Sequence, residues 1–249
     1  MKALILAAGY ATRLRPLTDA IPKQLLPVGG RPIVDWILDR IAETSADEVH
    51  VVTNARFAAD FEQWAENKDV QIHDDGTTSN EDRLGAIGDI EFAGLDDDLL
   101  VVAGDNLFDY SLADYEAYWR AHGGASCVAV LDVHDPELAK KYGIVDVDRD
   151  DRIVGFVEKP EHPPTTLCAT ATYLYRQEHV RLISTYLAEG NPPDQPGNYV
   201  AWLHKRAPVY AYRFEGEWYD IGDRDQLLEA DNRMRRRRGL PERSAYALE

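Results

Sequence analysis

"KALILAAGYATRLRPLTDAIPKQLLPV" spans residues 2–28 and changes character near its middle. An uninterrupted apolar run leads into small residues around Gly9, after which Arg13, Arg15 and Lys23 follow among prolines. An apolar run of this kind predicts a strand covered on both faces, as in a parallel sheet between helices. In open sheets of this class, ligands bind beyond the carboxyl ends of the strands, where small residues and cations suit a phosphate. The stretch therefore predicts an α/β sheet with an anion-binding loop at its edge.

The rest of the chain repeats the apolar strand pattern and, in the first half, alternates it with helical patterns. The predicted strands span 2–8, 48–53, 70–73, 99–104, 126–133, 152–158, 169–175 and 209–214, and the predicted helices span 32–43, 57–66, 111–122, 178–188 and 224–237. The acidic turn 148–151 predicts a hairpin in the second half, and 189–198 reads as a proline-rich loop. These patterns predict an α/β fold with a Rossmann-like, mostly parallel central sheet, helices on both faces and a small substrate-binding lobe.

The composition excludes several classes of protein. The 249 residues carry a formal net charge of -17, so the basic footprint of a nucleic-acid-binding domain is missing and binding to anionic membranes is disfavoured. The two isolated cysteines, Cys127 and Cys168, indicate buried reduced thiols. Because no signal-peptide pattern or membrane-spanning apolar segment is found, we expect a cytoplasmic protein. Whether the acidic surface reflects a salty habitat is left open.

Two common nucleotide motifs are absent from the opening stretch. A phosphate-binding loop of the kinase and ATPase type needs a Gly-Lys-Ser/Thr ending, and a dinucleotide fingerprint needs three spaced glycines where only Gly9 stands. On composition alone, a surface turn with solvated charges is the alternative to a phosphate site.

Residues 6–38 resemble the signature segment of the sugar-1-phosphate nucleotidylyltransferases, including the glucose-1-phosphate thymidylyl- and uridylyltransferases. The matching positions are Thr12, Arg13, Leu14, Pro16, Leu17, Thr18, Pro22, Lys23, Pro27 and Val28. Ala8 and Ala11 stand where the family commonly has Gly. The resemblance implies catalytic roles for Arg13 and Lys23. It implies nucleotide binding by Leu6, Ala7, Ala8, Gly9, Thr12 and Arg13.

Two acidic segments far apart in the chain resemble the metal-binding segments of the same family. "AGDNLF" (103–108) implies that Asp105 binds Mg2+, and "GEWYDIGD" (216–223) implies that Asp220 is the second ligand. An Asp at the carboxyl end of a strand suits a hard cation, although an Asx turn explains Asp105 equally well when it is taken alone. Asp223 stands where Thr is common, and we expect it to cap the following helix.

Further matches imply where the sugar phosphate binds. "VEKPEHP" (157–163) resembles the Glu-Lys-Pro segment in which the lysine binds the phosphate and the glutamate the sugar hydroxyls, here Lys159 and Glu158. Gly143 and Ala171 stand at positions that lie against the sugar, and Ala171 replaces a common Gly.

The nucleobase is less well specified by the resemblance. "RLGAIGD" (83–89) resembles the segment that recognises the base, with Gly85 as the close backbone contact. The preceding segment, 74–82, lacks the Gln-Pro pattern of many thymidylyl and uridylyl members, which leaves the base preference open.

The resemblance implies transfer of a nucleotidyl group from a nucleoside triphosphate to a sugar-1-phosphate, with Mg2+ as cofactor and release of pyrophosphate. Family frequency favours glucose-1-phosphate with dTTP or UTP as the substrates of this nucleotide-sugar biosynthesis. The alternatives are the same fold acting on phosphocholine with CTP, and a non-catalytic nucleotide-sugar-binding protein. Members of this kind often form dimers or tetramers, so a homo-oligomer is also expected.

We expect a single nucleotidyltransferase domain over 1–249. Within it, 1–125 is mainly the nucleotide-binding half, 126–222 mainly the sugar-phosphate-binding half, and 223–249 a C-terminal helix and tail. The basic run 233–238 closes a predicted helix, where cations complement the negative end of the helix dipole. We therefore interpret this run as a solvated helix terminus or a subunit contact rather than a nucleic-acid site.

Overall fold

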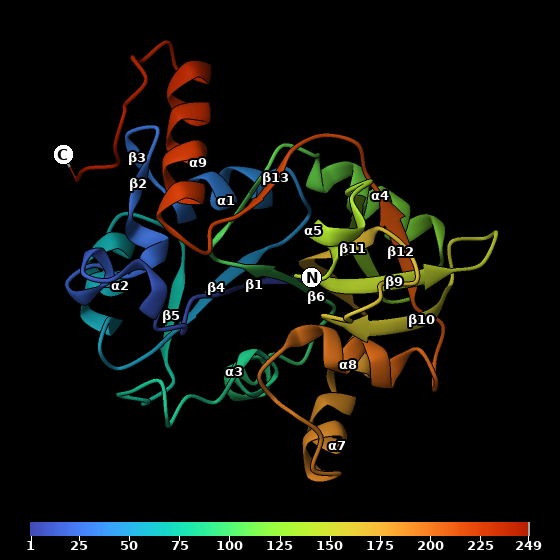
Figure 1. Cartoon of the computed structure of the whole chain (residues 1–249). Coiled ribbons are helices and arrows are strands. Elements are labelled where there is room, and N and C mark those ends of the chain that lie inside the picture. The colour runs from blue at the N-terminus through green and yellow to red at the C-terminus, as the bar shows by residue number, and fades with distance from the viewer. Residues whose placement is uncertain (249) are drawn as a thin grey trace.

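The computed structural model of the chain describes residues 1–248 and is built around one sheet of nine strands (Figure 1). The strands of this sheet are β1 (Lys2–Leu6), β4 (Glu48–Thr53), β5 (Gln71–Asp74), β6 (Leu99–Ala103), β8 (Cys127–Asp132), β9 (Gly143–Val147), β10 (Ile153–Glu158), β11 (Leu167–Tyr175) and β12 (Tyr210–Arg213). Their order is β10-β9-β11-β6-β1-β4-β5, with β8 paired to β11 and β12. Two small sheets join β2 (Pro27–Val28) to β3 (Arg31–Pro32) and β7 (Asn106–Phe108) to β13 (Trp218–Asp220).

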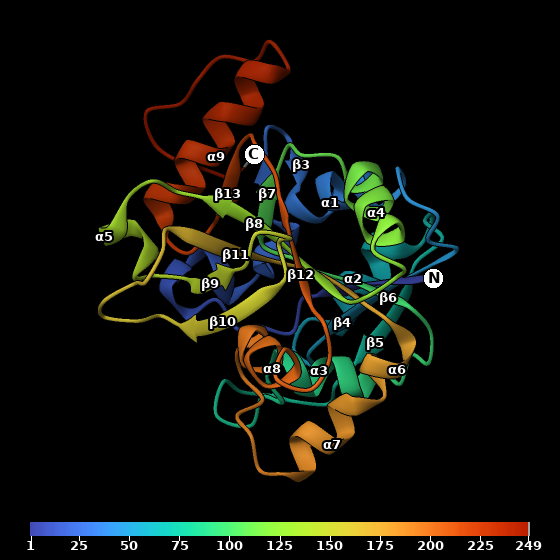
Figure 2. The same ribbon diagram turned by 90° about the vertical axis from the view of Figure 1, so that its right-hand side faces the viewer.

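Helices cover both faces of the sheet, as the apolar strand pattern predicts. The helices are α1 (Ile33–Ile41), α2 (Ala58–Ala65), α3 (Ala86–Ala93), α4 (Leu112–Ala121), α5 (Pro136–Ala139), α6 (Gln177–Val180), α7 (Leu182–Ala188), α8 (Pro196–Leu203) and α9 (Arg224–Arg237). Ala3 and Ile5 of β1 pack into one core with α1, α2, α4 and α9, whereas Leu4 packs into a second core with α3, α7 and α8. In Figures 1 and 2, α1, α4 and α9 accordingly lie above the sheet, and α3, α7 and α8 below it.

The first half of the sheet is parallel and the second half largely antiparallel. β1 pairs in parallel with β4 and β6, and β4 with β5, which places the carboxyl ends of β1 and β6 side by side. β11 joins β6 in the antiparallel direction and carries the β9–β10 hairpin, whose turn closes with a 2.9 Å bond from Asp148 N to Arg152 O. The predicted α/β class and the hairpin are confirmed, and both halves of the chain share one continuous sheet.

Besides the four-residue α5, two helices that line or support the cleft were not predicted from the sequence. α8 begins at Pro196, inside the segment expected to be a proline-rich loop, because proline is well tolerated in the first turn of a helix. α3 is short and contains Gly88, so its helical pattern is weak. Both helices gain their stability from packing against the sheet, which a local pattern does not reveal.

Several smaller expectations are confirmed. The Asp223 side chain caps α9 by accepting a 2.9 Å hydrogen bond from the Gln226 backbone N–H. Cys127 and Cys168 are both buried and free. Within residues 1–248, no helix combines the length and the apolar character needed to cross a membrane.

Candidate active site

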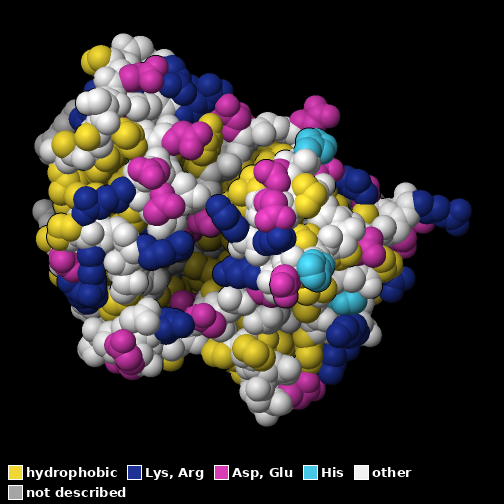
Figure 3. Space-filling model, viewed as in Figure 1, with side chains coloured by type: hydrophobic (Ala, Val, Ile, Leu, Met, Phe, Trp, Pro, Cys, Tyr) yellow, Lys and Arg dark blue, Asp and Glu magenta, His cyan; other side chains and the backbone are white. Residues whose placement is uncertain are grey.

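Two adjoining cavities lie at the carboxyl ends of β1 and β6. The larger has a volume of about 450 Å3 and the smaller about 180 Å3. Both are lined by Asp105, Lys159, Ala171, Asp194 and Asp220, so they form one continuous cleft. The space-filling view shows this side of the molecule hollowed near its middle, with Lys and Arg side chains gathered around the hollow (Figure 3). The lining of the cleft combines cations, such as Arg83 and Lys159, with acidic residues such as Asp105 and Asp220.

The pairing of β7 with β13 brings the two predicted metal ligands to the same place. Asp220 is in register with Asn106, and the Ile221 N–H donates to the Asp105 carbonyl at 3.4 Å. Lys23 is almost fully buried, and its Nζ lies 2.6 Å from Asp105 Oδ2. Burial, followed by the negative charge of Asp105, raises the pKa of the Asp220 carboxyl group. The nearby cations Lys23, Arg13 and Lys159 offset this rise only in part.

This pair of carboxylates fits a magnesium ion. Within the described chain, no group of three His, Cys, Asp or Glu side chains could hold a metal. Mg2+ does not need such a group, because it is commonly bound by one or two carboxylates together with substrate phosphates and water. A cation would relieve the crowding that raises the pKa of Asp220, so the residues present fit a divalent metal ion.

Arg13 lies at the edge of the same cleft and has no hydrogen bond or ion pair within residues 1–248. It is exposed on a 3-10 turn, Thr12–Leu14, and a Cβ added at Gly222 would lie 3.0 Å from its guanidinium. The turn starts at Ala11, which adopts a left-handed conformation with φ of 43° and accepts a 2.9 Å bond from the Thr18 hydroxyl. A glycine is commoner in this position because it adopts such angles without strain. Ala11 keeps the shape despite the substitution.

The predicted sugar-phosphate residues all line the smaller cavity. Glu158 fills the space beside two glycines: an added Cβ would lie 2.9 Å from its Oε2 at Gly143 and 2.5 Å at Gly197. Burial raises the pKa of Glu158, while Lys159, whose Nζ lies 3.9 Å away, opposes the shift. Ala171 sits at the irregularity of β11 with φ of 53°, which explains why glycine is common there.

The predicted nucleotide residues divide into two groups. Leu6, Ala8, Gly9 and Gly85 line the larger cavity. Ala7 does not line the cavity, because its side chain packs in the core with 1% exposure. Thr12 lies on the exposed turn and is also outside the cavity lining.

The structure also places residues in the cleft that the sequence did not single out. The loop before α8 crosses the start of α3, where Gly85 has φ of 80° and a Cβ would lie 2.7 Å from Pro193 O. The Ile87 N–H donates to Pro193 O at 2.8 Å. Asp194 then holds Arg83 through two hydrogen bonds of 2.9 and 3.2 Å. These contacts join segments more than a hundred positions apart, and no local pattern signals them.

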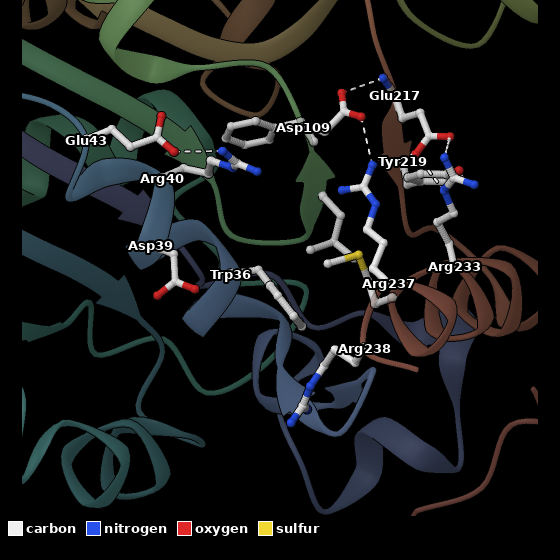
Figure 4. Close-up of a pocket in the computed structure, with 13 residues that line it drawn as sticks. Trp36, Asp39, Arg40, Glu43, Asp109, Glu217, Tyr219, Arg233, Arg237 and Arg238 are labelled. Atoms are coloured by element: carbon white, nitrogen blue, oxygen red, sulfur yellow. Dashed lines mark hydrogen bonds and ion pairs between the residues drawn. The ribbon is translucent and has the colours of Figure 1, made fainter. Parts of the chain in front are cut away.

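A separate pocket of about 360 Å3 lies between α1, β7, β13 and α9 (Figure 4). Its arginines are engaged by neighbouring groups: Arg40 by Glu43, Arg233 by Glu217, Arg237 by Asp109 and Glu217, and Arg238 by the Gly29 carbonyl. Arg40, Arg233 and Arg237 are therefore paired with carboxylates, whereas Arg238 donates to a neutral carbonyl group.

Comparison with known proteins agrees with this geometry. The model of the nucleotidyl transferase family matches residues 2–237. Two curated relatives are each 30% identical: a UTP–glucose-1-phosphate uridylyltransferase from Synechocystis sp., and a Sulfolobus acidocaldarius protein named for guanyl transfer to mannose-1-phosphate. Each match covers 89% of this chain and 60% of the relative.

A solved structure of UDP-glucose pyrophosphorylase with UDP-glucose superposes with a TM-score of 0.80. It covers 95% of this chain and 98% of that chain, at 23% identity, and so supports the fold alone. The chain spans between half and about three-fifths of the length of the curated relatives it matches. The family match nevertheless covers nearly all of the residues that form the sheet and the cleft, and the chain is therefore a member of the nucleotidyl transferase family of enzymes.

Proposed function

We propose that the chain transfers a nucleotidyl group from a nucleoside triphosphate to a sugar-1-phosphate and releases pyrophosphate. The observation that carries this proposal is the convergence of Asp105, directly before β7, with Asp220 on the paired strand β13, in a cleft that also holds Lys159 and lies within electrostatic reach of Arg13. The larger cavity would take the nucleotide and the smaller one the sugar phosphate, in line with the expected division near residue 125.

The reaction needs charge neutralisation and alignment more than it needs a protein base. The attacking group is a phosphate oxygen that already carries negative charge at neutral pH. Lys159, at the junction of the two cavities, would hold that phosphate, and Glu158 would bind the sugar hydroxyls. Arg13 has no carboxylate partner and would bind the triphosphate, stabilising the departing pyrophosphate.

Lys23 is proposed to act on the phosphates together with Asp105. Its ammonium group is buried against Asp105. It would therefore orient that carboxylate and add positive charge near the bound phosphates. Mg2+, held by Asp105 and Asp220, would supply further positive charge to the phosphate oxygens.

The nucleobase and the sugar are proposed from similarity. The named relatives include both guanyl and uridylyl transferases. The first pair of substrates to assay is glucose-1-phosphate with UTP or dTTP. Phosphocholine with CTP and simple nucleotide-sugar binding are the alternatives. A homo-oligomer and a cytoplasmic location stay predictions.

The test is a grid of four nucleoside triphosphates against several sugar-1-phosphates and phosphocholine, measured as pyrophosphate release with and without Mg2+. We expect Mg2+-dependent release with at least one sugar-1-phosphate. Release with phosphocholine alone would support the first alternative. Nucleotide-sugar binding without any release would support the second.

A further inference from the structure

Asp89 is a buried carboxyl group in the wall of the larger cavity. It lies in the first turn of α3 with 6% exposure, and its Oδ1 has no hydrogen-bond partner within residues 1–248. Buried carboxyl oxygens are normally paired, because an unpaired polar group in the interior is costly. Because Oδ1 is closed to solvent, its partner must lie among the neighbouring side chains, although Asp89 as a residue lines the cavity.

A second carboxyl group lies directly beside it. Asp75, which follows β5, accepts two 2.7 Å hydrogen bonds at Oδ1 from the backbone and hydroxyl of Thr77, whereas its Oδ2, like Asp89 Oδ1, is buried without a hydrogen-bond partner in the described chain. Burial, followed by the charge and hydrogen bond of Asp75, raises the pKa of Asp89 to about 8. At neutral pH Asp89 therefore carries a proton that it can donate to the neighbouring Asp75.

The charged groups around this pair do not provide a cation for it. Asp194, from the loop before α8, adds a further negative charge. Arg83, from the loop before α3, is already engaged by Asp194. The Tyr10 hydroxyl contacts Thr77 rather than either carboxyl group, and burial raises its pKa, so it stays neutral.

Asp89 belongs to the end of the cavity away from the predicted metal site. The residues that line this end include Tyr10, Asn80 and Gly85, and the electrostatic neighbours of Asp89 do not include Asp105 or Asp220. In the proposed function the phosphates lie beside Asp105 and Asp220, which leaves the nucleobase at the Asp89 end.

We infer that Asp89, hydrogen-bonded to Asp75, is a specificity-determining residue that accepts a hydrogen bond from an N–H group of the nucleobase. The proton of Asp89 lies between the two carboxyl groups, so the second carboxyl oxygen of Asp89, a residue that lines the cavity, is left as an acceptor. Loss of that proton would place two adjacent negative charges beside an anionic nucleotide and weaken its binding. The inference rests on the proposed function, since it identifies the occupant of the cavity as a nucleotide.

The experiment measures nucleotide affinity by calorimetry at pH 7 for the wild type, Asp89→Ala and Asp89→Asn, using whichever of UTP, dTTP, CTP and GTP binds most tightly. We expect Asp89→Ala to weaken binding about tenfold, as for a buried hydrogen bond that is lost. Asp89→Asn should recover most of that loss, because the amide keeps the acceptor oxygen and can donate to Asp75. Glu91→Gln, an exposed acid on the same helix, is the matched control.

The pH dependence gives an independent readout. Because the pKa of Asp89 is raised to about 8, affinity in the wild type should fall as the pH rises from about 7 to about 9. Asp89→Asn cannot lose this proton, and its affinity should change much less over the same range.

A base analogue that lacks the relevant N–H group identifies the contact. The analogues are 3-methyl-UTP or 3-methyl-dTTP, inosine triphosphate for GTP, and 2-pyrimidinone riboside triphosphate for CTP. We expect the wild type to lose affinity for the analogue and Asp89→Ala to add no further loss. If Asp89→Ala lowered the affinity for the natural nucleotide and for its analogue equally, the inference would be overturned. It would also be overturned if the loss of affinity depended on the ribose 2′-hydroxyl group instead of the base. Normal affinity of Asp89→Ala would also overturn it.

Failure of this inference is distinguishable from failure of the proposed function. If the wild type releases pyrophosphate while Asp89→Ala binds normally, only the role of Asp89 is wrong. If no combination of nucleotide and phosphorylated acceptor gives pyrophosphate, the proposed function is wrong whatever Asp89 does. Thermal melts of each variant separate loss of binding from loss of folding.

Discussion

The cleft and the pocket beside α9 contain the same kinds of charged residue in opposite states. In the α9 pocket, Arg233 and Arg237 lie against Glu217 and Asp109, so positive and negative charges cancel locally (Figure 4). In the cleft, Arg13 has no such partner in the described chain, and crowded acids raise the pKa of Asp220. Paired charges stabilise a fold, whereas charges left uncompensated lower its stability and are suited to a ligand.

The comparison predicts its largest effect at the metal ligands. Asp105→Asn should reduce pyrophosphate release by at least about a thousandfold, because it removes one of two charges that would hold Mg2+ and also the partner of Lys23. Asp220→Asn should have a similar effect. Near-normal turnover of Asp105→Asn at saturating Mg2+ would show that the cleft does not use this carboxylate for a metal.

Arg13→Ala tests the uncompensated cation and should lower turnover by about two to four orders of magnitude. Its thermal stability should stay close to that of the wild type, because Arg13 has no ion pair to lose within residues 1–248. A loss of only a few-fold in turnover would reduce Arg13 to a surface residue.

Lys159→Ala should act mainly on sugar-phosphate binding. We expect the KM for the sugar phosphate to rise about tenfold or more, with a smaller effect on kcat, because a phosphate contact made in both ground and transition states affects binding most. Steady-state kinetics with each substrate varied in turn would check this. An equal rise in the KM for the nucleotide would place Lys159 elsewhere in the cleft.

Arg237→Ala is the matched variant in the compensated pocket and should have the smallest effect. It breaks ion pairs with Asp109 and Glu217 that are partly exposed, so the free energy of unfolding should fall by only about 1 kcal/mol. Pyrophosphate release should stay within about twofold of the wild type. A large loss of turnover without a loss of stability would contradict the division drawn between the two regions.

Much of this architecture was predictable because it is encoded in short segments. The apolar runs predicted β1, β4 and β6, and the Asp223 cap and the β9–β10 turn follow from local hydrogen-bonding preferences. The motifs around Asp105 and Asp220 pointed to one cleft. The strands, the cap and the turn can be predicted from the sequence because each depends on neighbours within a few positions. The shared site of Asp105 and Asp220 was implied by the family resemblance.

The remaining features came only from the folded chain. α8, the loop that crosses Gly85, and the carboxyl pair of Asp75 and Asp89 have no local signature, since their stability or their pKa depends on groups brought together by the register of the sheet. The same holds for the ion pair between Lys23 and Asp105, two residues that are 82 positions apart in the sequence. Burial and proximity set the charge state and the hydrogen-bond partners of these side chains. Burial and proximity both arise from long-range packing. The sequence therefore gives the types of these residues, but only the tertiary structure shows which of them are paired.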